Sequence, residues 1–252
     1  MKSSKESLKS RGMFEDCDLA KFKYMTKEML LEYINSEIPH IRSSAIHELM
    51  KRFKDNATIT MILERLKVES ALYTRLEICN SLEQGDDNVA KQMIDYLGMI
   101  GENQYIKLPD KVSKKISYPL PRDIIARSLG RMNPTILPVL LSVLESEEEQ
   151  KIMEVMDAIG YLLFYNEHLA TSQNIIFILN AINQFRDNQV IVWKTTTCLS
   201  AFSLKESISK LNQIKIEYHN SVIAKEAERS LEIIQKRCTA ISMLPQVFFE
   251  KQ

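Results

Sequence analysis

One nine-residue helical pattern recurs six times in this chain, and no other feature constrains its fold as much. The first three copies align without a gap and carry an arginine in the same column; they occupy residues 41–49, 74–82 and 121–129. Three weaker copies keep the aliphatic last residue and lose the arginine; they occupy residues 151–159, 191–199 and 223–231. Apolar residues four positions apart, such as Ala45 and Leu49, form one stripe of a helix. The pattern therefore predicts six amphipathic helices.

A second amphipathic stretch precedes each copy and completes a two-helix repeat. Successive copies lie roughly 30 to 47 residues apart, which is a period typical of such repeats. We predict these first helices at residues 26–35, 57–67, 88–100, 134–144, 172–185 and 204–218. Asn133 precedes Pro134 as a helix-start signal, and Ser203 stands three residues before Glu206 in the spacing of a capping box. The chain is then almost entirely helical.

The second helices resemble those of HEAT-repeat proteins, an armadillo-like family. Such helices open with an aliphatic residue and arginine, continue with small and apolar residues, and end on leucine. Ile41, Arg42, Ala45 and Leu49 match this pattern best, and the resemblance covers about residues 24–237. It implies an all-α fold, a right-handed α-solenoid of about six helical hairpins. It specifies an architecture and no reaction.

The resemblance also implies a structural role for the arginine column. In HEAT-repeat proteins this arginine commonly bonds an acidic residue near the turn, and the bonds form a ladder between neighbouring repeats. The arginines here are Arg42, Arg75 and Arg122, and Glu37 and Glu69 are the nearest acidic candidates. Because the last three copies lack the arginine, we do not expect such a ladder in the C-terminal half.

A solenoid core grows by adding repeats, so we predict a single domain despite the length of 252 residues. Its predicted parts are an N-terminal extension, the repeat region and a C-terminal tail, at residues 1–23, 24–237 and 238–252. We expect residues 1–12 to be mobile and Met13 and Phe14 to help cap the first repeat. The apolar tail is expected to cap the last repeat, and the alternative is that it docks elsewhere.

Composition and charge favour a soluble protein without a membrane partner. The 33 basic and 33 acidic side chains balance, which removes the global argument for binding nucleic acid or an anionic membrane. No apolar core and cleavage site follow the first residues, and no apolar run approaches the roughly 20 residues that span a bilayer. We therefore expect a cytoplasmic location.

The sequence contains no arrangement typical of a catalytic, metal or cofactor site. The four histidines lack metal-ligand spacing, and we expect His40 and His47 to be ordinary surface residues. The four cysteines form no CxxC pair, and we expect Cys79 and Cys198 to be small buried thiols on repeat helices. Glycine-rich phosphate loops and GxSxG elbows are also missing. We predict no cofactor, no metal and no catalytic residue.

The repeat register predicts which side chains line the concave face of the solenoid. One column is polar throughout, and we name it the His47 column; it consists of His47, Asn80, Arg127, Asp157, Thr197 and Arg229. Neighbouring columns add charges of both signs, from Glu77, Arg131, Glu154, Lys194 and Glu226. This mixture lacks the single-sign stripe that follows a phosphate backbone. We favour a solvated helix face without a role and keep these residues as the candidate surface for a protein partner.

The only tryptophan belongs to a second column, which we name the Trp193 column. It shares this column with Leu76 and Met153. A partly exposed tryptophan is a favoured interface anchor, but a lone tryptophan also packs efficiently between helices. We favour packing for Trp193 and keep it among the candidate partner-binding residues.

An insert at residues 101–120 makes the longest break in the repeat. Loops of this length are usually functional or disordered. Its lysines, chiefly Lys111, Lys114 and Lys115, alternate with tyrosines and aliphatic residues. We therefore expect a segment that packs partly on the helices and offers lysines to a partner. The alternative is a surface connection without a role.

Two classes of function compete. The missing motifs and mixed charge favour a non-catalytic scaffold that binds a protein partner on its inner helices and with the insert. The alternative is a DNA-binding enzyme similar to the alkylpurine DNA glycosylases with HEAT-like repeats. Such a site would use Arg127, Arg131, Asp157, Trp193 and Lys194. Balanced charge argues against it, and a third resemblance, to bilin lyases with HEAT-like repeats, rests on the fold alone.

Overall fold

The computed structural model describes residues 4–242, and the side chains of residues 4–239. Within these residues the chain consists of α-helices, two short 3-10 helices and irregular connections, with no strand. The prediction of an all-α fold is confirmed. No helix of the described part is both long and apolar enough to cross a membrane.

The described chain divides into two compact units. Unit 1 comprises residues 4–104 and 121–143, and unit 2 comprises residues 105–120 and 144–242. Most of the predicted insert therefore packs with unit 2, although the segments on both sides of it belong to unit 1. That the repeats form one continuous array remains a prediction.

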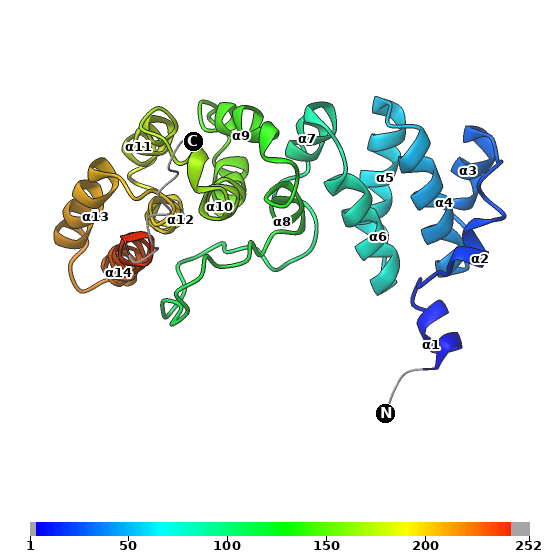
Figure 1. Ribbon diagram of the computed structural model, residues 1–252, viewed down its shortest axis with the longest axis horizontal. Coiled ribbons are helices and arrows are strands. Elements are labelled where there is room, and N and C mark those ends of the chain that lie inside the picture. Colours follow the sequence, from blue (N-terminus) through cyan, green and yellow to red (C-terminus); the bar gives the residue numbers. More distant parts are fainter. Residues whose placement is uncertain (1–3, 243–252) are drawn as a thin grey trace, which may run out of the picture. The chain divides into compact units, whose positions relative to one another are not determined.

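Unit 1 is built from two layers of helices (Figure 1). Its elements are α1 (Lys5–Lys9), α2 (Asp16–Leu19), α3 (Lys27–Tyr33), α4 (Pro39–Arg52), α5 (Asn56–Val68), α6 (Leu72–Glu83), α7 (Asp87–Ile94), α8 (Ile124–Leu129), η1 (Pro134–Ile136) and α9 (Leu137–Val143). Helix α6 packs between α4 and α8, whereas α7 packs between α5 and α9. Successive pairs such as α3 with α4, α5 with α6 and α7 with α8 join the two layers.

Unit 2 repeats this arrangement with longer helices. Its elements are α10 (Glu149–Tyr165), η2 (Glu167–Leu169), α11 (Asn174–Gln184), α12 (Gln189–Leu199), α13 (Lys205–Glu217) and α14 (Val222–Ser242). Helix α12 packs between α10 and α14, and α11 and α13 pack against α12 and α14 from the other layer. All six pattern copies and all six preceding stretches thus contain helix at the predicted places.

Local sequence explains where most helices start. Asp86 begins α7 by accepting hydrogen bonds from the backbone N–H groups of Asn88 and Val89. Asn133 accepts from the N–H of Thr135 at the start of η1, as expected. The predicted capping box at Ser203 is wrong. The N-cap of α13 is Leu204, one residue after Ser203, and no side chain forms a cap hydrogen bond there.

The N-terminal segment is more ordered than expected. Residues 5–9 form α1, whose N-cap Ser4 accepts a hydrogen bond from the N–H of Ser7. The carbonyl of Arg11 then accepts a hydrogen bond from the N–H of Tyr73 on α6. Helix α2 packs on α4, which agrees with a covering role for this segment. The predicted C-terminal cap lies outside the described residues beyond residue 242.

Candidate functional site

The predicted surface columns bring together charged side chains on one face of unit 2. We call this side of the three helices the α10/α12/α14 face; it carries the unit 2 members of the His47 and Trp193 columns. Lys194 on α12 is 1% exposed, and its Nζ lies 2.9 Å from Glu154 Oε2 and 3.0 Å from Asp157 Oδ2 on α10. Burial opposes the charge of Lys194, but the two carboxylates outweigh it and raise the pKa of Lys194 above 10.5.

A second buried ion pair lies on α14. The Arg229 Nη1 donates to Glu226 Oε1 at 2.6 Å, and both side chains are almost fully buried. Burial raises the pKa of Glu226 above 4.5, and the Arg229 charge opposes this shift. The expectation that the His47 column faces solvent is wrong for Arg229, and the same expectation for the neighbouring columns is wrong for Glu154, Lys194 and Glu226. Helical periodicity predicts the direction of a side chain and does not predict what covers it.

The insert is what covers Arg229. Its guanidinium donates from Nε and Nη2 to the backbone carbonyl of Lys115, at 3.1 and 2.9 Å, and from Nη2 to the carbonyl of Ser117 at 2.9 Å. In Figure 1 the non-helical insert passes along α10, α12 and α14 as a long green loop. A side chain of the His47 column therefore binds the main chain of a segment more than 100 residues earlier in sequence.

Tyr118 anchors the insert in a slot on α10. The side chain is 3% exposed and packs against Tyr161 and Phe164, with ring centroids 6.5 and 5.6 Å away. Gly160 makes the slot, because a Cβ at this position would lie 1.8 Å from the Tyr118 hydroxyl oxygen. That hydroxyl has no hydrogen-bond partner within the described residues, and its burial raises the pKa of Tyr118 well above 10.

Trp193 carries the other anchor of the insert. Tyr105 packs edge-on against its ring with centroids 4.9 Å apart. The expectation that Trp193 serves packing is therefore supported, and its partner is the insert. Most other insert side chains face solvent, including Lys111, Lys114 and Lys115 as predicted. A cleft of about 290 Å³ lies between Lys114 and Lys115 of the insert and α14.

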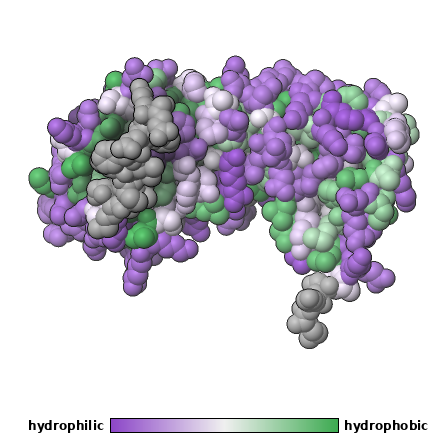
Figure 2. All heavy atoms as spheres, in the orientation of Figure 1, coloured by the Kyte–Doolittle hydropathy of each residue, from purple (hydrophilic) through white to green (hydrophobic). Residues whose placement is uncertain are grey.

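The corresponding face of unit 1 carries an open cleft. It has a volume of about 520 Å³ and lies on α4 and α6, where its lining includes His47, Lys51, Lys54, Glu77, Asn80 and Gln84. These positions of the repeat match those that the insert covers in unit 2: the His47 column contains both Asn80 and Arg229. Figure 2 shows hydrophobic side chains near α1 and the adjacent end of α6, where Leu72 and Leu76 are exposed.

His47 gives the unit 1 cleft a titratable group. Its Nδ1 lies 3.0 Å from Glu77 Oε1, which also accepts a hydrogen bond from the Ser81 hydroxyl at 2.9 Å. The hydrogen bond that His47 donates to the Glu77 carboxylate raises the pKa of His47 above 6.5, against the opposing effect of burial. Phe14 packs against the imidazole with ring centroids 5.5 Å apart. His47 is thus part of a polar network and is more than an ordinary surface residue.

The arginine column forms the predicted bridge at Arg42. Arg42 donates from Nε and Nη2 to the two carboxylate oxygens of Glu69, at 2.8 and 2.7 Å, and Arg65 reaches the same carboxylate. Glu37 contributes only its backbone carbonyl, to Arg42 Nη1. Arg75 donates to the backbone carbonyl of Glu69 at 2.9 Å, which continues the chain of contacts. Arg122 is exposed in unit 1.

The five residues suggested for a DNA-binding site do not belong to one unit. Arg127 and Arg131 lie in unit 1, where Arg127 donates to the carbonyl of Pro121 and Arg131 lies 3.8 Å from Glu83. The other three, Asp157, Trp193 and Lys194, lie in unit 2 among the ion pairs and the insert anchor. None of the described contacts assembles them into a basic groove.

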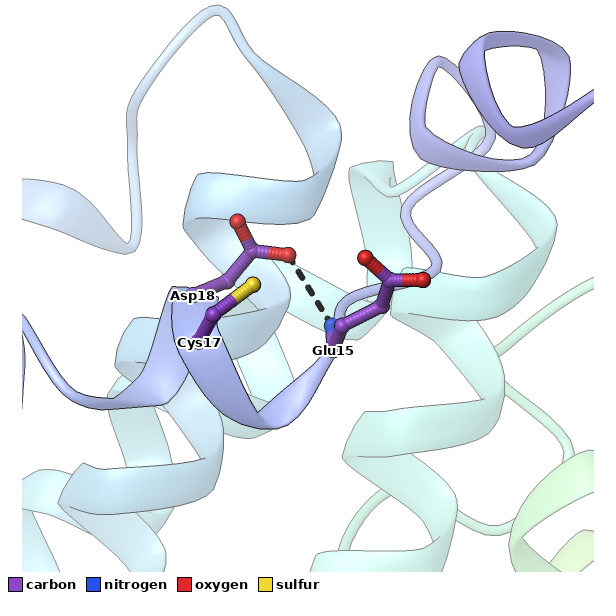
Figure 3. A group of neighbouring side chains, drawn as sticks. All are labelled: Glu15, Cys17 and Asp18. Carbon is purple, nitrogen blue, oxygen red and sulfur yellow. Dashed lines mark hydrogen bonds between the residues drawn. The ribbon is translucent and has the colours of Figure 1, made fainter.

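One acidic cluster at the N-terminus has ligand atoms close enough to hold a cation. Figure 3 shows Glu15, Cys17 and Asp18, whose ligand atoms lie within 4.8 Å of one another. Lys9 Nζ lies 2.8 Å from Asp18, and Lys5 Nζ lies 2.9 Å from Glu15. The N–H of Glu15 also donates to Asp18 as a helix cap. Lysines and a helix start therefore already satisfy these carboxylates.

The two tyrosine anchors and Gly160 are functional features that the sequence interpretation missed. The signal for the slot was a glycine inside a helix, where glycine is unfavourable without a packing reason. Neither protein-family models nor curated protein sequences give a match to this chain. Its function must therefore be inferred from the two helix faces themselves.

Proposed function

We propose that the protein is a non-catalytic, HEAT-like repeat scaffold that binds an extended segment of a protein partner on the α4/α6 cleft of unit 1. One observation carries this proposal. On the matching face of unit 2, a non-helical segment of the chain already lies across the second helices of the repeats and is held by Arg229 and Trp193. The repeat thus provides a surface suited to polypeptide main chain.

The unit 1 cleft offers equivalent chemistry for a partner. Asn80 shares a column with Arg229 and can donate to main-chain carbonyls as Arg229 does. Leu76 shares a column with Trp193 and is 46% exposed, so it can support an apolar side chain. Lys51 and Lys54 add positive charge at the same cleft, next to Glu77. This combination of polar donors, an apolar support and mixed charges suits a peptide better than a phosphate backbone.

Site-specific photo-crosslinking tests the proposal. A photoreactive amino acid at Asn80 should cross-link one protein through a single mapped segment, whereas the same group at Met61 on α5 should not. A synthetic peptide of the mapped segment should bind the wild-type protein, and Asn80→Asp, which removes the amide donor at nearly the same size, should weaken binding about tenfold, or ~1.4 kcal/mol. The matched control Met61→Asp should leave the affinity unchanged.

Two outcomes would contradict the proposal. In the first, cross-links from Asn80 and Met61 give the same set of proteins, which indicates random encounter. In the second, duplex DNA binds the protein with a steep salt dependence and Asn80→Asp has no effect on peptide binding. The second outcome would favour the glycosylase-like alternative, because phosphate contacts release counterions.

A further inference from the structure

We propose that residues 105–120 are an internal ligand of unit 2, and that their release opens the α10/α12/α14 face to a partner segment whose tyrosine or phenylalanine ring enters the slot at Gly160. This inference concerns a second surface, in a different unit from the α4/α6 cleft. Its test uses the full protein, and both the fluorescence signal and the peptide site belong to unit 2. Either proposal can therefore fail without the other.

Few contacts hold the insert in place. Residues 106–120 form no backbone-to-backbone hydrogen bond within the described part of the chain. Ile106, Ile116 and Leu120 are exposed, and Tyr118 is the only buried side chain between residues 105 and 120. A segment with few buried apolar contacts and no backbone ladder opens at a lower free energy than the helices beneath it.

The surface beneath the insert is charged, which a purely structural cover does not require. Lys194 with its two carboxylates and the Glu226–Arg229 pair lie on this face. Burying ions costs desolvation free energy, and apolar residues of similar volume would pack at least as stably. Rehydration of these groups therefore offsets part of what is lost when the insert leaves. Such a face is suited to exchange one segment for another.

The slot defines what a partner must carry. Gly160 leaves room for one aromatic ring between Tyr161 and Phe164. Because the Tyr118 hydroxyl forms no hydrogen bond within the described residues, the slot selects the ring and not the hydroxyl. Arg229 forms its hydrogen bonds to the insert through backbone carbonyls, so it does not select particular side chains at the positions of Lys115 and Ser117. The expected partner is a non-helical polypeptide segment with one phenylalanine or tyrosine as its anchor.

Two substitutions separate release of the insert from binding in the slot. Tyr118→Ala removes the anchor and leaves the slot empty, whereas Gly160→Ala removes the anchor by filling the slot. Alanine is the better helix former, so Gly160→Ala should keep α10 folded. Lys111→Ala, at an exposed lysine of the insert, is the matched control.

Trp193 is the only tryptophan and reports on the insert directly. In both Tyr118→Ala and Gly160→Ala its emission should shift to longer wavelength and acrylamide quenching should increase, as Tyr105 moves away. The control Lys111→Ala should match the wild type. Far-UV circular dichroism verifies that each variant retains its helices.

Peptide binding is then measured by fluorescence anisotropy with a labelled synthetic peptide of residues 113–122. The tethered insert has an effective concentration of about 1 mM or more, so it competes strongly in the wild type. Tyr118→Ala should bind the peptide at least about tenfold more tightly than the wild type, and adding Gly160→Ala should abolish the gain. A peptide with Phe in place of Tyr118 should bind at least as well, and one with Ala should not bind.

Three results would overturn the proposal. One is unchanged emission and quenching of Trp193 in both folded variants. Another is folded Tyr118→Ala that binds no peptide up to about 1 mM. If Tyr118→Ala does not fold, Tyr118→Leu takes its place, since it keeps an apolar side chain at the slot and removes the aromatic ring. Failure of that folded variant to bind the peptide would identify the insert as a fixed structural cover.

Discussion

Lys194→Met tests whether the buried charges of unit 2 act as a network. The Lys194 ammonium lies 2.9 and 3.0 Å from Glu154 and Asp157, and the three side chains are 1%, 2% and 14% exposed. Methionine keeps most of the side-chain volume and removes the cation. The two carboxylates then lie close together without the lysine cation between them. Removing one partner of a buried ion pair in this way lowers the free energy of unfolding by about 3–5 kcal/mol. Domains are typically stable by about 5–15 kcal/mol, so the loss should be large.

Urea unfolding followed by Trp193 fluorescence measures the effect in unit 2. With a loss of about 4 kcal/mol and a slope of roughly 2 kcal/mol per molar urea, the midpoint should fall by ~2 M. Lys215→Met is the control, because Lys215 pairs with Glu228 at 3.1 Å with both side chains about half exposed. Removing this surface pair should cost less than about 1 kcal/mol.

The pH dependence follows from the same ion pairs. The pKa of Lys194 is raised above 10.5, so its stabilising contribution is fully present below pH 10.5 and is lost as pH rises through the higher folded value. The triple variant Lys194→Met, Glu154→Gln, Asp157→Asn should recover most of the stability. A Lys194→Met cost no larger than that of Lys215→Met would refute the network.

Three further predictions concern single contacts. Arg42→Met should destabilise unit 1 by about 3 kcal/mol in urea unfolding followed by circular dichroism, because Glu69 is 2% exposed and loses its bidentate partner. By NMR titration the pKa of His47 should lie above 6.5 and fall in Glu77→Gln. The contribution of protonated His47 to the stability of unit 1 should therefore be fully present below pH 6.5 and be lost as pH rises through the folded pKa, with a smaller loss in the variant. Tyr118→Phe should raise the free energy of unfolding by up to about 1 kcal/mol, because the hydroxyl is buried without a hydrogen bond among the described residues, and a lower urea midpoint would contradict this reasoning.

The helices could be predicted from sequence because their signal is local. Apolar stripes at four-residue spacing place α4, α6, α10, α12 and α14 where the structure has them. The Arg42–Glu69 bridge was also within reach, since it joins adjacent repeats along the chain. The capping box at Ser203 failed because an N-cap depends on where the backbone leaves the extended region, and Leu204 holds that position.

The candidate site could be predicted only in part, because its contacts are far apart in sequence. Periodicity places Asp157 and Arg229 in one column of the repeat, but the column alone cannot indicate that Lys115 and Ser117 of the insert cover Arg229. Lys194 shows the same limit, because its partners lie on the preceding second helix rather than in water.

Gly160 carries the information that would have linked the insert to unit 2. Glycine in a helix interior costs roughly 0.5–1 kcal/mol relative to alanine, so its place within α10 calls for a compensating contact. The ring of Tyr118 supplies that contact, since any Cβ would meet its hydroxyl oxygen at 1.8 Å. The sequence thus contains both halves of the contact, a glycine and a tyrosine in an insert, and only their pairing in space is missing. Substitution of Gly160 therefore tests the contact between the insert and α10 directly.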